Sequence, residues 1–360
     1  MKRNSNIELL RIISSCFVVF MHVINDWIGF NNQVLGIDDF FLIILDSGGR
    51  VACNIFLVIS CWYLCDSVFK THRIVQTWLK LWVYSVGLSL IGGGIIKLAG
   101  WKQFGLPVYI ISFFPFLDTA VWYISVYLML LMVSPYIQLL VSSIGKIKHL
   151  ILTVILLFIF SGVSLFKFIA YGTKIDSIYC NFAWFCVVYI TTSYIKKYYT
   201  EAIKQKWGLT LGIIIYVALC SLKSMNVKFA AFFLSDLKSF PNILIAILLF
   251  GGFLSFTGRT NKCINIMASS CPAIYIIHQL PVFRNVLANT VLVLQQLYTP
   301  NILLGSIVIS FVIILSSFII DYFIVSPILK AIIDLLTNHT MIFNKLNKIE
   351  EIVNTSYCKG

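Results

Sequence analysis

Charged residues are scarce in this chain of 360 residues, because aspartate, glutamate, lysine and arginine together make up only 11% of it. A soluble domain carries about 25% of these residues, so the composition excludes a water-soluble globular fold. Hydrophobic residues reach 59%, and the mean hydropathy is +0.93. The apolar runs are continuous over about 20 residues rather than alternating, which predicts helices and excludes a β-barrel. We therefore expect an all-α, polytopic membrane bundle.

Common cofactor and metal motifs are also missing. The sequence contains no phosphate-binding loop, zinc-binding helix, Gly-x-Ser-x-Gly elbow or dinucleotide fingerprint. Its ten cysteines are scattered, and Cys61 and Cys65, four residues apart, have no second pair or nearby histidine. We expect the cysteines to be small apolar residues and predict no metal site. The net charge of +13 is spread over short loops, which is typical of membrane topology and predicts no nucleic-acid partner.

The apolar runs predict ten transmembrane helices. Their ranges are 7–28, 40–64, 81–98, 120–140, 150–169, 178–195, 207–222, 240–256, 264–283 and 302–325. About two thirds of the 27 lysines and arginines fall on the side of the N-terminus, which places both termini in the cytoplasm. Pro107 and Pro115 interrupt the interval 99–119, a candidate re-entrant segment. We predict a transmembrane domain at 1–328 and an amphipathic cytoplasmic tail at 329–360 on the inner membrane surface.

The first span carries three ionisable residues, Glu8, Arg11 and His22, and their spacing places them on one stripe of a helix together with Ser15. Glu8 and Arg11 are three residues apart and can form an ion pair, which lowers the cost of burying either of them. A rise of about 1.5 Å per residue places His22 about 22 Å above Ile7, in the outer half of the bilayer. The alternative is a histidine that is merely hydrogen-bonded to a neighbouring helix, with a snorkelling Arg11.

A second intramembrane histidine, His278, lies about 21 Å above Ile264 in a later span that also rises from the inside. The two histidines are therefore predicted at a similar depth, facing one pocket. Tyr275 lies one turn before His278, and Pro272 and Pro281 bracket this helix, which favours local opening toward a cavity. A purely structural hydrogen-bonding role for His278 remains an alternative.

Cations gather at the predicted cytoplasmic ends of the spans. Lys70 and Arg73, with Arg11 at the same level, suit the phosphates of a cofactor that arrives from the cytoplasm, although such a cluster is also an ordinary topology signal. Asp321 in the last span is left with three readings: it neutralises Arg11, it neutralises Lys330, or it lies on a proton path.

Four residues are candidates for contacts with a substrate on the outer side. They are Arg50, Ser60, Trp122 and Tyr123. The competing interpretations are snorkelling for the arginine, a bond back to its own helix for the serine, and an interfacial aromatic belt for the pair at the start of the fourth span.

Taken in chain order, these segments resemble the acyltransferase-3 family of polytopic membrane acyltransferases. The family opens with an acidic residue, two further residues, an arginine, ten further residues and a histidine, a pattern that Glu8, Arg11 and His22 match. Further similar positions are Ile55, Phe56, Ser60 and Cys61 for a Phe-Phe pair followed by Ser-Gly, Lys70 and Arg73 for Arg-x-x-Arg, Trp122-Tyr123 with Pro135, and Tyr275 with His278 for Tyr-x-x-His. Arg50 is similar to the surface-polysaccharide branch. This chain departs from the pattern at Ile55 and Cys61, and it has Ser326 where an acidic residue usually precedes the last proline.

The resemblance implies transfer of an acetyl or other short acyl group from cytoplasmic acyl-CoA to a hydroxyl of a cell-surface glycan, such as a capsule or exopolysaccharide, or of its lipid-linked precursor. It implies a multi-pass protein of a bacterial plasma membrane. His22 becomes a general base or a transient acyl carrier, and Glu8 orients Arg11. Tyr275 and His278 stabilise the oxyanion or orient the acceptor. Association with further copies of the chain is left open.

Two other classes fit a basic polytopic chain. A glycan polymerase or flippase would need long outer loops with several arginines, and the outer loops here are short. A proton-coupled transporter would use Glu8, His22, His278 and Asp321 as a relay, and it would more often show repeated halves, which this sequence does not.

Overall fold

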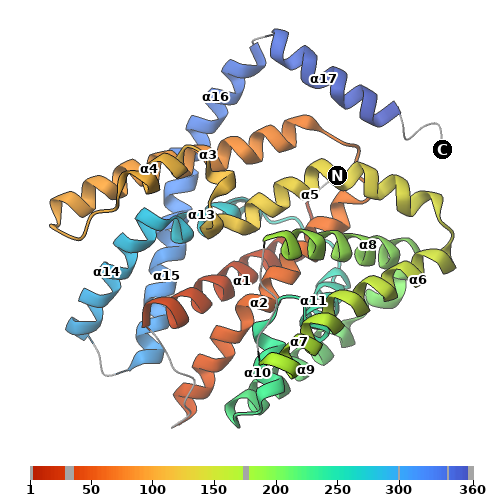
Figure 1. The fold of residues 1–360 in the computed structure, drawn as a ribbon, viewed down its shortest axis with the longest axis horizontal. Helices are drawn as coiled ribbons and strands as arrows, with labels where there is room; N and C mark the ends of the chain where they lie inside the picture. The colour runs from red at the N-terminus through yellow and green to blue at the C-terminus, as the bar shows by residue number, and fades with distance from the viewer. Residues whose placement is uncertain (1–2, 29–35, 173–177, 299–300, 339, 356–360) are drawn as a thin grey trace.

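The computed structural model describes residues 3–28, 36–172, 178–298, 301–338 and 340–355. These residues form a bundle of helices without β-strands, as the composition predicts (Figure 1). In the described part of the chain, seven helical segments are long and apolar enough to cross a membrane, and two bent helix pairs raise this number to nine. The chain is therefore a helical, multi-pass membrane protein.

Most predicted spans coincide with a helix. The correspondence is α1 (Ser5–His22) with the π-helical turn η1 (Val23–Ile28), α2 (Ile37–Leu64), α3 (Thr71–Leu98), α5 (Trp122–Ser143), α6 (Lys146–Leu157) with η4 (Phe158–Gly162) and α7 (Val163–Tyr171), α9 (Lys206–Ser224), and α15 (Ile302–Ile320) with η5 (Asp321–Val325). The sixth predicted span lies in α8 (Ile178–Ile203), which is outside the set of nine. The interval 99–119 holds a short helix, α4 (Leu106–Ser112), and the turn η2 (Pro115–Leu117).

Helices α1 and α2 pack closely at the centre of the bundle. Gly48 and Gly49 of α2 make this possible, because a Cβ atom on either would overlap a side chain of α1, Phe17 or Met21. Two adjacent small residues are a common way for membrane helices to approach each other. The close approach brings the following residue of α2, Arg50, to the level of the first intramembrane histidine.

One predicted span, 264–283, is broken by a sharp bend, and a second bend lies just before the predicted span 240–256. Between α13 (Cys271–Gln279) and α14 (Pro281–Tyr298) the chain turns by 78°, and α12 (Lys262–Ser269) precedes α13. The structure therefore differs from the continuous 264–283 helix, because Pro281 lacks the amide hydrogen that would continue α13 and instead begins a new helix. The other bend, of 57°, separates α10 (Lys228–Ser235) from α11 (Phe240–Leu254).

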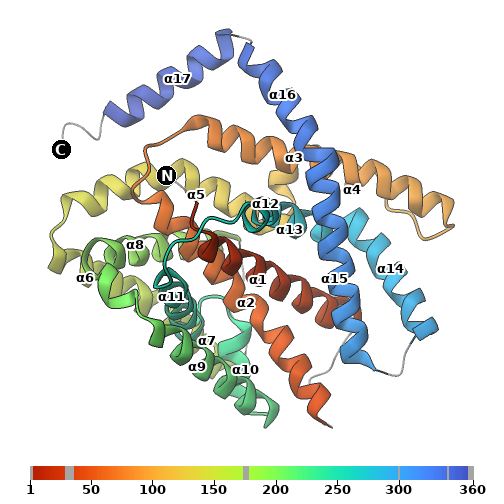
Figure 2. The same ribbon diagram turned by 180° about the vertical axis from the view of Figure 1, so that it is seen from behind.

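The C-terminal helices extend past the bundle and then turn back across it. Helix α15 continues through η5 into α16 (Ser326–Asn338) as one segment, Ile302–Leu335, so the helix runs through the predicted domain boundary at 328. Helix α17 (Thr340–Thr355) then turns back over α3 (Figure 2). There the carboxylate of Glu350 accepts hydrogen bonds from the amide and hydroxyl of Thr71, at 3.1 and 3.2 Å, and so caps α3. The membrane-surface position of the tail stays a prediction.

Candidate functional site

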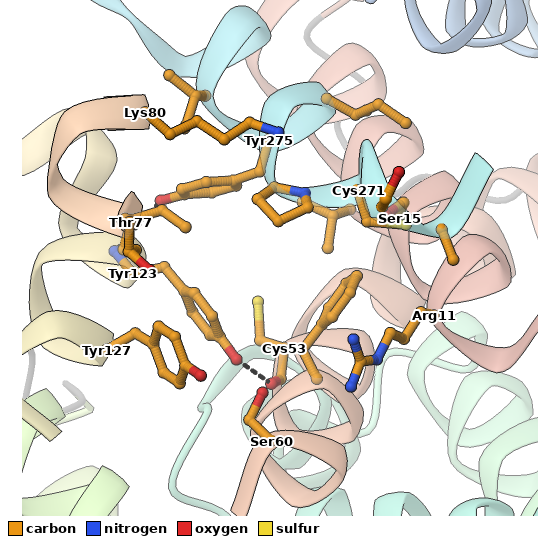
Figure 3. A pocket seen from close by; sticks show the side chains of 18 of the residues that line it. Arg11, Ser15, Cys53, Ser60, Thr77, Lys80, Tyr123, Tyr127, Cys271 and Tyr275 are labelled. Atoms are coloured by element: carbon orange, nitrogen blue, oxygen red, sulfur yellow. Dashed lines mark hydrogen bonds between the residues drawn. The ribbon is translucent and has the colours of Figure 1, made fainter. Parts of the chain in front are cut away.

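A cavity of about 440 Å³ lies between α1, α2, α3, α5 and the α12–α13 segment (Figure 3). Its volume is within the usual range for a small-molecule site. Its polar lining residues include Arg3, Glu8, Arg11, Ser15, Ser60, Gln76, Thr77, Lys80, Tyr123, Tyr127, Tyr275 and His278, and its apolar ones include Val18, Phe56, Ile124 and Ile274. The structure thus brings together residues that are far apart in the sequence, from the first helix to the thirteenth.

The stripe on α1 forms one wall of this cavity. Glu8, Arg11 and Ser15 all line it, as expected for residues three and four apart on one helix face. The Arg11 Nη1 atom lies 3.8 Å from Glu8 Oε2, and Glu8 is buried. Tyr123 and Tyr127 face Arg11 from the opposite wall (Figure 3).

A further cation of the cavity, Lys80, was not singled out from the sequence as a partner of Asp321. Its Nζ lies 2.9 Å from the buried Asp321 Oδ1, and the Tyr84 hydroxyl donates to the same oxygen at 2.6 Å. Neither partner considered for Asp321 is the one found, because η5 directs this carboxylate toward α3. Arg3, Arg11 and Lys80 therefore supply the positive charge of the cavity.

Lys70 and Arg73 do not line the main cavity. They border a second, much smaller pocket of about 10 Å³ beside the α2–α3 connection. There the Arg73 guanidinium donates to the Ser67 hydroxyl at 3.0 Å. Their role toward a phosphate cofactor stays a prediction.

The imidazoles of His22 and His278 face each other, with ring centroids 5.2 Å apart. His278 lines the cavity and is fully buried. Its Nδ1 lies 2.5 Å from the carbonyl oxygen of Ile274, and a carbonyl only accepts, so Nδ1 carries the proton of the neutral ring. Nε2 is then an acceptor, and it has no partner among the described residues.

Unlike His278, His22 does not line the cavity, and its side chain is 19% exposed. Its Nδ1 lies 2.8 Å from Asp26 Oδ2, which also accepts a bond of 2.6 Å from Arg284 Nη2. A carboxylate on Nδ1 fixes the tautomer, leaves Nε2 free to take a proton and stabilises the imidazolium that results. The spacing of four residues from His22 to Asp26 is the signal that could have identified this pair, since such residues are neighbours on a helix.

A polar network that includes the buried Asp46 holds the turn that carries Asp26. The preceding residue, Asn25, donates to the Asp46 carboxylate, and Lys223 of α9 pairs with the other Asp46 oxygen at 2.9 Å. The π-helical turn η1 is thus attached to α2 and α9, and π-helical turns are frequent at functional sites. This attachment fixes the direction in which Asp26 points.

The other predicted site residues are divided between the cavity and its surroundings. Ser60, Tyr123 and Tyr275 line the cavity. The Tyr275 hydroxyl accepts from the Tyr123 amide at 3.3 Å and lies 3.4 Å from the Ala120 carbonyl. Trp122 does not line the cavity and packs against the buried Phe185.

The histidine pair therefore separates two different environments. On one side is the cavity with its three cations, and on the other is the Asp26–Arg284 pair, whose side chains are 30% and 36% exposed. Such an arrangement can receive two reactants from opposite sides. No group of three or more potential metal-ligating histidine, cysteine, aspartate or glutamate residues occurs in the described ranges.

A comparison with models of protein families shows which family the chain belongs to. The family model described as "Acyltransferase domain" matches residues 4–322, which include both histidines, Asp26, Arg284 and the helices α1 to α15. Comparisons with curated proteins and with solved structures give no match. The matched segment covers most of the chain, and the chain belongs to the acyltransferase-3 family.

Proposed function

We propose that this membrane acyltransferase moves an acetyl or other short acyl group from acyl-CoA to a hydroxyl of a cell-surface glycan or its lipid-linked precursor, in a bacterial plasma membrane. The observation that carries the proposal is the His22–His278 pair, placed between the cationic cavity and the exposed side. Family membership replaces the polymerase, flippase and transporter alternatives with acyl transfer.

The cavity suits the donor. The phosphates of a coenzyme A thioester would bind to Arg3 and Arg11, since guanidinium groups bind phosphate oxygens bidentately, with Lys80 as a further positive charge. The apolar lining, including Val18 and Phe56, suits the pantetheine arm. The thioester would then reach His278 at the end of the arm, with the acyl group beside the histidine pair.

The exposed side suits the acceptor. Nε2 of His22 takes the proton of an acceptor hydroxyl while the oxygen of that hydroxyl attacks the thioester carbonyl. A C–O bond forms, the C–S bond breaks, and the CoA thiolate leaves and takes the proton from the imidazolium. Asp26 stabilises that imidazolium. The second route, in which His22 carries the acyl group transiently, uses the same free Nε2.

His278 and Tyr275 have different tasks in this scheme. Because Nδ1 of His278 already donates to Ile274, the neutral ring offers only an acceptor at Nε2, which suits a hydrogen bond from a second hydroxyl of the acceptor, beside the one that His22 deprotonates, rather than stabilising an oxyanion. The Tyr275 hydroxyl accepts from the Tyr123 amide and donates only through a long contact to the Ala120 carbonyl, so its proton can turn toward the developing oxyanion at little cost.

The proposal is tested with purified protein in liposomes. Acetyl-CoA labelled in its acetyl group is supplied with a chemically de-O-acetylated bacterial polysaccharide, and release of CoA and transfer of label are both measured. We expect both to depend on the protein and on the acceptor. Failure of acetyl-CoA to bind, with no label transferred from longer acyl-CoA thioesters either, would contradict the proposal.

A further inference from the structure

Arg50 lies in the membrane-spanning helix α2 and has no polar partner among the residues that the structure describes. Its side chain is half-buried at the middle of α2, and it forms no ion pair or hydrogen bond in the described part of the chain. The other cations near the reacting groups are compensated, since Lys80 pairs with Asp321 and Arg284 pairs with Asp26. An uncompensated guanidinium inside a membrane protein is costly and usually has a function.

The position of Arg50 is set by the packing of α1 against α2. Gly48 and Gly49 allow the two helices to touch immediately before Arg50, and Cys53, one turn further, lines the cavity. The positive charge of Arg50 contributes to the electrostatic potential at the side chains of His22, Asp26 and Tyr275. Arg50 therefore lies on a central helix within electrostatic reach of the histidine pair and of Tyr275, although it does not line the cavity.

The charge balance on the acceptor side is positive. Asp26 is the one carboxylate that faces His22 in the described ranges, and two arginines act on that pair. The second carboxylate nearby, Asp46, already forms an ion pair with Lys223 at 2.9 Å. One positive charge, that of Arg50, thus remains uncompensated on this side of the histidine pair, and a guanidinium binds a carboxylate or phosphate better than a neutral hydroxyl.

We infer that the acceptor is an acidic glycan, in which a carboxylate or phosphodiester binds Arg50 and thereby presents a neighbouring hydroxyl to His22. This inference rests on the proposed acyl transfer and specifies the acceptor for the same site. The anionic group neutralises the free guanidinium, and its two hydrogen bonds fix the orientation of the sugar ring. Neutral glycans lack this contact and are poorer acceptors.

The experiment compares acidic acceptors with a neutral one. An oligomer of galacturonic acid, the same oligomer after reduction of its carboxyl groups, and a glycerol-phosphate oligomer carrying sugars are each supplied with labelled acetyl-CoA to the protein in liposomes. For the wild-type protein we expect kcat/KM about 10- to 100-fold higher with at least one acidic acceptor than with the reduced oligomer, the range for charge-assisted hydrogen bonds. The acidic acceptor with the higher kcat/KM shows whether Arg50 binds a carboxylate or a phosphodiester.

Substitution of Arg50 tests whether the preference for acidic acceptors depends on this residue. Arg50→Gln should abolish the preference for the acidic acceptor and leave KM for acetyl-CoA unchanged, whereas Arg50→Lys should keep part of it. The matched control is Arg259→Gln, because Arg259 is an exposed loop arginine without a side-chain partner. Arg50→Lys decides the question if Arg50→Gln fails to fold.

Two results would overturn the inference. One is equal transfer to the acidic and reduced oligomers by the wild-type protein, and the other is an equal loss with both acceptors in Arg50→Gln, which would assign Arg50 to folding or to lipid headgroups. Absence of acetyl-CoA consumption with every acceptor is a different outcome. It contradicts acyl transfer itself, and with it the inference.

Discussion

The rings of His22 and His278 lie 5.2 Å apart and both use Nδ1 for a hydrogen bond, His22 to a carboxylate and His278 to a backbone carbonyl. Both Nε2 atoms are therefore acceptors when the rings are neutral. Only His22 has an anion that stabilises its protonated form. In the proposed mechanism His22 is therefore the base and His278 the positioning residue, the same order that the stripe of Glu8, Arg11 and His22 indicates in the sequence.

Replacement of the carboxylate beside His22 tests this distinction. Asp26→Asn removes the charge that stabilises the imidazolium and permits the wrong tautomer, so kcat should fall about 10²- to 10⁴-fold while KM for acetyl-CoA stays near its wild-type value. Steady-state assays in liposomes measure both constants. Glu201→Gln, at an exposed glutamate of α8, is the control and should be without effect. Unchanged kcat in Asp26→Asn would remove Asp26 from the mechanism.

The charge of Arg11 can be separated from its ion pair. Glu8→Gln alone keeps the guanidinium in the cavity, and Glu8→Gln/Arg11→Gln removes it without leaving Glu8 buried and unpaired. We expect KM for acetyl-CoA to rise about tenfold between the two variants, because a charge-assisted contact to phosphate is lost. A change confined to the KM of the acceptor would contradict the assignment of this cavity to the donor.

How much of this site the sequence could predict depends on the kind of relationship. Glu8, Arg11 and Ser15 share the cavity wall because helical periodicity alone fixes their direction. Counting residues along two rising helices also placed the two histidines at one depth, and their rings do meet. Local geometry on a continuous helix is thus accessible from spacing.

Relationships that depend on helix packing were not accessible in this way. The partner of Asp321 is Lys80 because of how η5 lies against α3, and no spacing indicates this. Arg284 reaches Asp26 only because the chain bends by 78° before α14. Pro281 signalled a break in the helix, but the direction of the new helix is set by packing.

The Lys80–Asp321 pair predicts a stability effect. Lys80→Met leaves the buried Asp321 carboxylate without its cation, which should destabilise the protein by about 3–5 kcal/mol, and Lys80→Met/Asp321→Asn should recover much of this loss. The apparent Tm in detergent measures both. If the double variant is as unstable as Lys80→Met, the unpaired carboxylate of Asp321 is not the cause of the stability loss in Lys80→Met.

Attachment of the last helix is predicted to depend on Glu350. Glu350→Ala removes the cap on α3, worth about 1 kcal/mol, so the released population of α17 should rise about fivefold. Cleavage by trypsin at the exposed Lys348 should accelerate by the same factor, since proteolysis follows the open population. The Glu201→Ala control should be cleaved at the wild-type rate. Cleavage of Glu350→Ala at the wild-type rate would show that other contacts hold α17.

The central claim is that His22 accepts the proton, or the acyl group, during transfer from acyl-CoA. Its most direct test is the initial rate of label transfer from acetyl-CoA to the acceptor in liposomes that contain equal amounts of folded wild-type or His22→Ala protein. We predict that His22→Ala binds acetyl-CoA with wild-type affinity and transfers at least 10²-fold more slowly. Transfer at the wild-type rate would contradict the account.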